Sequence, residues 1–278
     1  MKDQLGDRMK LYESFEAKRT LMPGLPIVAR LDGKSFSKFT KGLSRPYDKR
    51  MSDLMIKTTK FLVEYANANC GYTQSDEISL VWFSEDPKTQ PYFGGRIMKM
   101  VGELAAKASV FFNRELPNYL PEKADQTPTF DCRVWNVPSL EEATNTFLWR
   151  EWDATKNSIS MAAQHYYSHQ ELNGINGKEK QELLFQKGVN WNDYPTFFKR
   201  GTYVQRQRKM IKFSATELEK LPTKHAARTN PDLEIERNVV ETLSLPPLES
   251  LFISERIEVL IRGRDFQKVR EESNKFFE

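Results

Sequence analysis

The order of the apolar runs along the chain constrains the fold more than any other feature of the sequence. Runs with a period of two or of 3.6 residues predict, in chain order, a strand at 26–31, a helix at 48–68, a strand pair at 70–83, a helix at 95–116 and a strand at 129–137. This β-α-β-β-α-β order is that of a ferredoxin-like unit. We therefore expect an α/β (α+β) fold in which helices pack on an antiparallel sheet.

The segments that flank this unit are mostly helical. We expect an amphipathic helix at 8–22, a helix at 140–170 with a candidate break near Asp153, a helix at 178–187, a strand-like arm at 201–214, a loop at 222–231 and a charged helix at 265–276. The chain then divides into a core at 1–137 and a helical and hairpin C-terminal region at 138–278.

Three acidic residues lie where the predicted strands would bring them together. Asp32 ends the first strand and is followed by Gly33, while Asp76 and Glu77 begin a later one. Carboxylates at neighbouring strand ends repel each other unless a cation lies between them. Mg²⁺ suits such a site, and two metal ions could activate a hydroxyl and neutralise a leaving pyrophosphate, as in palm-type polymerases. The competing interpretation is that both acidic motifs only form turns.

Basic and small residues follow the first acid and favour a phosphate site. A helical turn beginning at Ser35 would point backbone N–H groups at an anion, and four nearby cations would add charge: Lys34, Lys38, Lys41 and Arg45. The pattern of a Walker A loop is absent from the sequence. A solvated basic edge is the alternative interpretation.

A second basic stretch lies in the C-terminal region. Residues 199–228 hold nine basic residues and two acidic ones, although the whole chain carries a net charge of only +4. Such a local surplus could bind the phosphate backbone of a nucleic acid, or it could be a solvated basic face.

Composition excludes several other classes of protein. No run approaches the ~18 apolar residues that a membrane span requires, and the charged N-terminus does not resemble a secretory signal. The two cysteines, Cys70 and Cys132, can form neither a disulfide framework nor a four-cysteine zinc site. We therefore expect a cytoplasmic protein without a membrane partner.

Five segments together resemble a known family. They are IVARLDGKSFSKFT, YTQSDEISLVWF, FDCRVWNVPS, WREWDATKNSISMAA and FFKRGTYVQR, in this order. This set is similar to the tRNA-His guanylyltransferase family, and more closely to its bacterial, guanylyltransferase-like 3′-to-5′ polymerase branch. The resemblance implies a palm-like core that binds two Mg²⁺ ions, uses GTP and ATP as substrates and adds nucleotides to the 5′ end of a tRNA. It also implies a homo-oligomer, with a tetramer favoured.

The resemblance also implies roles for individual residues. Asp32, Asp76 and Glu77 would be catalytic, with Asp32, Asp76 and the Gly33 carbonyl as metal ligands. Nucleotide binding would involve Asp32, Gly33, Lys34, Ser35, Phe36, Ser37, Arg45, Ser75 and Asp76. The tRNA would contact Asn157 and Lys187 from the resemblance, and Lys199, Arg200, Arg206, Arg208 and Lys209 from the basic stretch.

Two departures from the family pattern bear on the choice of substrate. Ser37 and Thr155 stand where the eukaryotic members carry histidines. The second histidine is associated with the dedicated tRNA-His reaction, so its absence favours template-dependent repair of tRNA 5′ ends. Two alternatives stay open at this point: another two-metal nucleotidyl enzyme, such as a nucleotide cyclase, and a non-catalytic RNA-binding protein.

Overall fold

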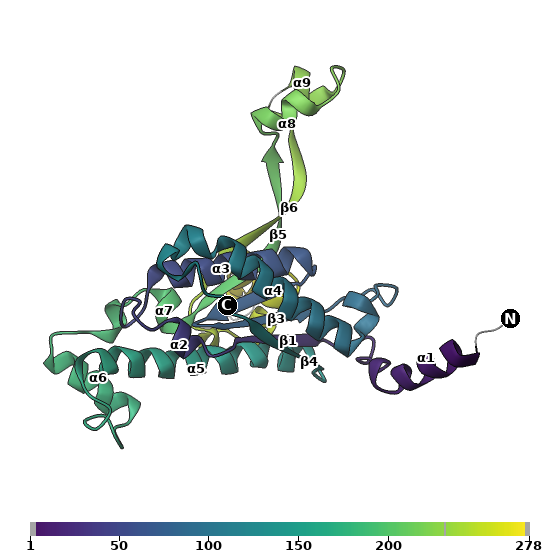
Figure 1. Cartoon of the computed structure of the whole chain (residues 1–278). Coiled ribbons are helices and arrows are strands. Elements are labelled where there is room, and N and C mark those ends of the chain that lie inside the picture. Colours follow the sequence, from purple (N-terminus) through teal and green to yellow (C-terminus); the bar gives the residue numbers. More distant parts are fainter. Residues whose placement is uncertain (1–3, 231, 276–278) are drawn as a thin grey trace.

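An antiparallel sheet of six strands forms the centre of the chain in the computed structural model, which describes residues 4–230 and 232–275 (Figure 1). The strands are β1 (Ile27–Gly33), β2 (Cys70–Gln74), β3 (Glu77–Trp82), β4 (Phe130–Asn136), β5 (Thr202–Lys212) and β6 (Glu234–Leu243). Their order is β4-β1-β3-β2-β5-β6. The first four strands therefore have the ferredoxin-like arrangement, and the fold class predicted from the sequence is confirmed.

Helices cover both faces of the sheet. Helices α3 (Lys49–Tyr65) and α4 (Ile97–Tyr119) lie on one face, and α5 (Leu140–Tyr166) runs along the other (Figure 1). Alternate residues of β3 enter two separate apolar cores: Leu80 packs with α3 and α4, whereas Val81 packs with Phe147 of α5. Strand β3 is therefore buried on both faces, and its successive side chains enter opposite cores.

Helix α3 begins where the sequence places it. The Asp48 side chain accepts a hydrogen bond from the backbone N–H of Arg50 and so caps the helix. Helix α4, in contrast, continues beyond the predicted end and contains Pro117. The proline lies in the last turn, where it removes a single backbone hydrogen bond, and Leu120 still donates to the Leu116 carbonyl.

Helix α5 is continuous, so the candidate break near Asp153 is wrong. The helix begins at the cap Ser139, whose hydroxyl accepts the backbone N–H of Glu142. Asp153 does not disturb the backbone because its carboxylate is held by side chains of the same helix, Arg150 and Asn157. Helix α5 therefore runs without interruption along one face of the sheet.

The remaining elements are shorter. They are α1 (Gln4–Ala17), α2 (Phe36–Phe39), α6 (Gly177–Gln186), α7 (Thr196–Arg200), α8 (Ala215–Lys220), α9 (Ala226–Thr229), α10 (Ile253–Arg256) and α11 (Phe266–Lys275). Single turns of 3₁₀ helix lie at Tyr92–Gly95, Pro121–Lys123, Trp191–Asp193 and Leu248–Ser250, and a π-helical turn lies at Ile257–Ile261. None of the described helices is long and apolar enough to span a bilayer.

Strands β5 and β6 form an arm that projects from the body (Figure 1). Only the first residues of β5, Thr202 to Gln205, pair with β2, and the rest of the strand pairs with β6 alone. The sequence pattern did not identify β6, and α9 lies within the segment predicted as a loop. The sheet is therefore shared between the two predicted regions, 1–137 and 138–278, and that division stays a prediction.

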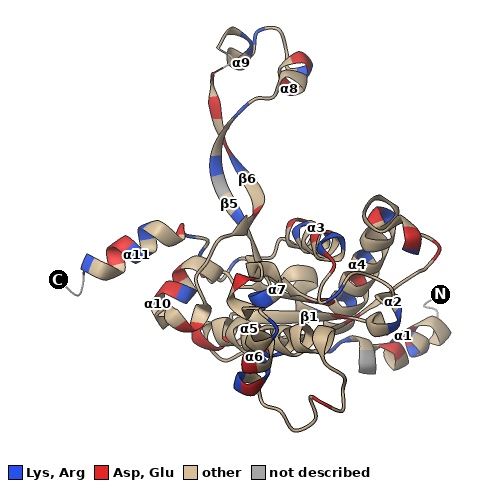
Figure 2. Cartoon of the chain, turned by 90° about the vertical axis from the view of Figure 1, so that its left-hand side faces the viewer, with Lys and Arg blue, Asp and Glu red and all other residues tan. Residues whose placement is uncertain are grey.

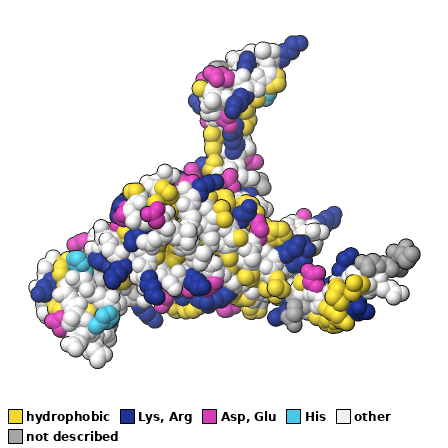
Figure 3. Space-filling model, viewed as in Figure 1, with side chains coloured by type: hydrophobic (Ala, Val, Ile, Leu, Met, Phe, Trp, Pro, Cys, Tyr) yellow, Lys and Arg dark blue, Asp and Glu magenta, His cyan; other side chains and the backbone are white. Residues whose placement is uncertain are grey.

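Helix α1 differs most from its prediction. It begins earlier than the predicted helix 8–22, ends earlier, and extends away from the body (Figure 1). Its apolar residues Met9, Tyr12 and Phe15 are all exposed, and apolar side chains gather over this helix on the molecular surface (Figure 3). A helix is therefore present with shifted bounds, but its apolar residues are exposed and do not form a buried face.

Candidate active site

The acidic residues of β1 and of the β2–β3 turn meet at one end of the sheet. Asp32 and Glu77 are direct partners in the β1–β3 register, so their side chains leave the sheet on the same face. The backbone N–H of Gly33 donates to the Asp76 carbonyl at 3.1 Å, which joins the turn to the end of β1. The predicted convergence of Asp32 and Asp76 is therefore present in the backbone arrangement.

The electrostatics of this corner favour a cation. Burial, followed by the charges of Asp32 and Glu77, raises the pKa of Asp76 to about 6, although the Ser75 hydroxyl donates to its carboxylate at 3.1 Å. Within the described part of the chain, no ion pair neutralises Asp32 or Asp76. Two adjacent carboxylates without a counter-charge are stabilised by a bound cation.

The residues present suit Mg²⁺ better than a metal that needs a full protein cage. Among residues 4–230 and 232–275, no three His, Cys, Asp or Glu side chains converge closely enough to hold a metal ion. Mg²⁺ is commonly held by one or two carboxylates together with waters and substrate phosphates. Asp32, Asp76 and the Gly33 carbonyl could supply such a partial set.

Glu77 has a partner on α5 that the sequence analysis missed. The Arg150 guanidinium contacts the Glu77 carboxylate at 2.6 Å and the Asp153 carboxylate at 2.8 Å. Asn157 donates to the same Asp153 oxygen at 3.2 Å. The side chain of Arg150 is only 6% exposed, so Glu77 is held by a buried cation and is oriented from α5. The sequence did offer one signal for the role of Arg150. Arg150 and Asp153 are three positions apart in a predicted helix, and residues with this spacing lie on the same side of a helix.

The segment after Asp32 forms a tight turn. Lys34 donates its backbone N–H to the Thr129 carbonyl at 2.8 Å, and Ser35 adopts a left-handed conformation with φ 59° before the short helix α2. The side chains of Lys34, Ser35 and Ser37 are exposed and can face a phosphate. Arg45, which precedes a cis proline, is also exposed.

Phe36 has a different position from its neighbours in this turn. Its ring is buried in the core and contacts the rings of Phe39, Phe112 and Phe130. A Cβ atom added to Gly33 would lie 2.4 Å from the Phe36 ring, so the glycine is required by close packing. Phe36 can therefore contribute only its backbone to nucleotide binding.

The basic residues predicted to bind tRNA fall into two groups. Asn157 and Lys187 are exposed, and the Lys187 ammonium lies 5.4 Å from the Tyr167 ring centroid. Lys199 is half-buried, bonds the Asn192 carbonyl and lies over the Trp191 ring. Asn157 lies in α5, Lys187 is the C-cap of α6, and Lys199 lies in α7.

The second group is engaged within the chain. Arg200 lies 3.6 Å from the buried carboxylate of Glu151, and Arg206 donates to carbonyls at the end of α3. Lys209 pairs with Glu241 of β6, and the side chain of Arg208 lies outside the described part of the structure. Their assignment to tRNA stays a prediction, and the internal partners of Arg200 and Arg206 weigh against it.

The arm is also less basic than the sequence window 199–228 indicated. Four acids lie beside β5. Three of them, Glu234, Glu236 and Glu241, belong to β6, and Asp232 lies two residues before that strand. Basic and acidic residues consequently alternate along the arm (Figure 2). The stretch 199–228 gave no sign of this charge balance, because the strand that pairs with β5 follows about thirty residues later in the chain.

Comparison with known proteins gives a consistent result. A family model described as "tRNAHis guanylyltransferase" matches residues 6–138, and one described as "Thg1 C terminal domain" matches residues 140–244. The tRNA(His) guanylyltransferase of Neurospora crassa is 26% identical over 253 residues, which cover 83% of this chain and 85% of that protein.

Solved structures agree in fold. A bacterial tRNA(His) guanylyltransferase (Thg1)-like protein in complex with ATP has a TM-score of 0.69 at 38% identity, over 73% of this chain and 88% of its own. A second bacterial structure, with GTP, has a TM-score of 0.68 at 30% identity, over 89% and 94% of the two chains. The chain described here belongs to the tRNA(His) guanylyltransferase family.

Proposed function

We propose that this chain adds nucleotides to the 5′ end of a tRNA in the 3′-to-5′ direction, with ATP or GTP activating that end. The observation that carries the proposal is the meeting of Asp32 and Asp76 without a neutralising partner among the described residues. Family membership supports a tRNA guanylyltransferase, and the bacterial relatives bound to ATP and GTP support nucleoside triphosphates as substrates.

Mg²⁺ would supply the Lewis acidity of this reaction when it is bound. Asp32, Asp76 and the Gly33 carbonyl would hold the metal ions. Glu77, oriented by Arg150, would keep their surroundings negatively charged. Lys34, the exposed serines of the turn and Arg45 would bind the triphosphate of a nucleotide and fix the position of that nucleotide in the site.

The absence of histidine at Ser37 and Thr155 favours repair of truncated tRNA 5′ ends over a reaction dedicated to tRNA-His. A tetrameric state, two metal ions in each site and a cytoplasmic location stay predictions. Light scattering would measure the oligomeric state, and metal titration of the purified protein would count the metal ions in each site.

The test is incorporation of labelled GTP into a tRNA that lacks its first nucleotide, in the presence of Mg²⁺. We expect label on the RNA from the unmodified protein and none from Asp32→Asn or Asp76→Asn. Asp86→Asn, which changes an exposed acid in the loop after β3, is the matched control and should keep full activity. A labelled cyclic product would identify a nucleotide cyclase instead. Retarded tRNA without label would identify a binding protein.

A further inference from the structure

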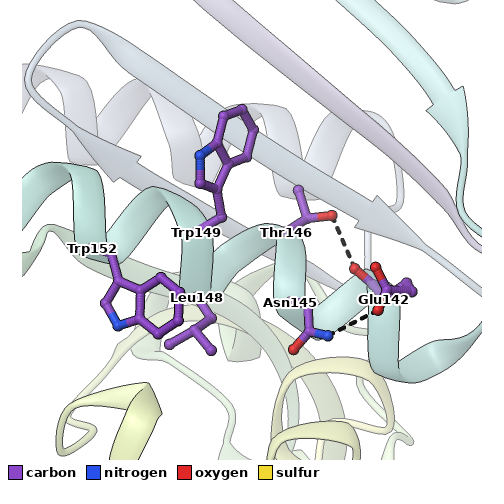
Figure 4. Close-up of a pocket in the computed structure, with 6 residues that line it drawn as sticks. All are labelled: Glu142, Asn145, Thr146, Leu148, Trp149 and Trp152. Carbon is purple, nitrogen blue, oxygen red and sulfur yellow. Dashed lines mark hydrogen bonds between the residues drawn. The ribbon is translucent and has the colours of Figure 1, made fainter.

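A half-exposed tryptophan of α5 lies beside strand β1, close to the acidic corner. Trp149 is 49% exposed and lines an open pocket of about 450 Å³ with Trp152, Leu148 and the polar side chains of Asn145 and Thr146. Glu142 completes the lining and accepts a hydrogen bond from Asn145 (Figure 4). Trp152 donates its indole N–H to Glu249 at 2.9 Å, whereas no side chain or carbonyl among the described residues accepts the indole N–H of Trp149.

Two guanidinium groups lie near the ring of Trp149. The Arg150 guanidinium lies 4.6 Å from the ring centroid, and that of Arg30 lies 5.7 Å from it. Arg30 is the direct partner of Arg133 in the β1–β4 register, so two cations lie side by side on one face of the sheet. Like charges opposite each other destabilise a sheet, and the only acid that pairs with them in the described chain is Asp131, 3.7 Å from Arg133. An anion such as a phosphate would relieve this repulsion.

We name Arg30, Arg133 and Trp149 the stacking patch. It lies beside the proposed catalytic acids, because Arg30 precedes Asp32 by two residues on β1 and leaves the strand on the same face. Two residues of a strand span about 7 Å, roughly the length of one extended nucleotide. A nucleotide next to the reacting end of an RNA could therefore reach the stacking patch.

The chemistry of the patch fits an unpaired nucleotide better than a duplex or a protein. An exposed indole offers a flat surface to a base, and adjacent guanidinium groups bind phosphate. A tRNA carries unpaired 3′ nucleotides beside its 5′ end. We infer that the stacking patch binds an unpaired 3′ nucleotide of the RNA substrate, with its base on Trp149 and its phosphate on Arg30 and Arg133. This inference rests on the proposed function.

The test measures how an overhang changes RNA affinity. Two RNA hairpins with the same stem are compared, one blunt and one with an unpaired 3′ overhang that contains 2-aminopurine. For the unmodified protein, we expect the overhang to lower the Kd about tenfold and to quench the 2-aminopurine fluorescence. Trp149→Ala should remove most of this gain, and Trp149→Phe should keep most of it because the ring is retained.

Two controls separate stacking from general damage. Phe15→Ala, which removes an exposed aromatic ring from α1, should leave the overhang effect unchanged. Trp149→Ala should also keep its affinity for the blunt hairpin, because Arg150 retains its ion pairs with Glu77 and Asp153.

Three results would overturn the inference: equal affinity of the unmodified protein for both RNAs, a preserved overhang effect in Trp149→Ala, or an equal loss for both RNAs in that variant. Labelled GTP incorporation into a tRNA that lacks its first nucleotide is measured separately. If the unmodified protein incorporated nothing but retained the overhang effect, the proposed function would fail while the RNA site remained.

Discussion

Replacing Asp76 with asparagine should stabilise the metal-free protein while it abolishes the reaction. The pKa of Asp76 is raised from 3.8 to about 6, mainly by burial and by the charge of Asp32. Stability associated with the protonated group is therefore present below pH 3.8 and is lost as the pH rises through about 6. A difference of about two pH units corresponds to about 3 kcal/mol, and partial solvent access reduces this to about 2 kcal/mol.

The assay is urea unfolding with EDTA, at about pH 7.5 and again at about pH 4.5. We expect Asp76→Asn to raise the free energy of unfolding by about 2 kcal/mol at the higher pH and by far less at the lower. Adding Mg²⁺ at about a hundredfold excess over its Kd should reverse the order, because that excess stabilises the unmodified protein by about 2.7 kcal/mol and the variant has lost a ligand.

Asp48→Asn is the matched control with the opposite sign. Hydrogen bonds from Arg50 lower the pKa of Asp48 to about 2, and this residue is only 8% exposed. The resulting stability is present above pH 3.8 and is lost as the pH falls through about 2. Asparagine can still cap α3 but cannot attract the guanidinium, so it should cost about 2 kcal/mol at neutral pH. A destabilised Asp76→Asn together with a destabilised Asp48→Asn would refute the reasoning about the acidic corner.

Three further predictions concern residues that the fold, rather than the motifs, brought to attention. Arg150→Gln should slow nucleotide addition about 100-fold in single-turnover assays, because Glu77 loses its orientation, while GTP affinity changes little. Gly201→Ala should destabilise the protein in urea by more than about 2 kcal/mol, since φ is +76° and the new Cβ would lie 2.6 Å from the Thr73 carbonyl oxygen. Arg206→Gln should cost about 1 kcal/mol of stability through lost contacts with the α3 carbonyls; a large loss of tRNA affinity without that cost would restore Arg206 to the RNA surface.

The sequence predicted those parts of the fold in which local pattern and tertiary burial agree. The pattern beyond Glu77 indicated β3 because successive residues, such as Leu80 and Val81, point to opposite faces of the sheet and enter two different cores. Asp48 indicated the start of α3 because a helix cap is a local interaction. In both cases, residues within a few positions of each other carry the information.

Prediction failed where the partner of a segment lies far along the chain. Strand β6 has polar residues on both sides because only β5 pairs with it, so no buried face produces a pattern. The basic run of β5 indicated a nucleic-acid surface only because Glu241 and Asp232, which pair with Lys209 and Lys212, come later in the sequence. Helix α1 failed for the opposite reason, since its apolar residues have the right spacing but no cover among the described residues.

The register of β1 explains why the acids could be found from the sequence while the cations beside them could not. Asp32 is marked by the glycine that follows it and by a second acidic motif, whereas Arg30 is an ordinary strand residue two positions earlier. Only strand pairing places Arg133 opposite Arg30, and only the crossing of α5 brings Trp149 close to Arg30. A row of carboxylates and a row of guanidinium groups then lie one step apart on the same face. The row of carboxylates at Asp32 would hold metal ions, and the row of guanidinium groups at Arg30 would hold an RNA phosphate. The direction in which the substrate lies across the sheet would then follow from the order of Arg30 and Asp32 along β1.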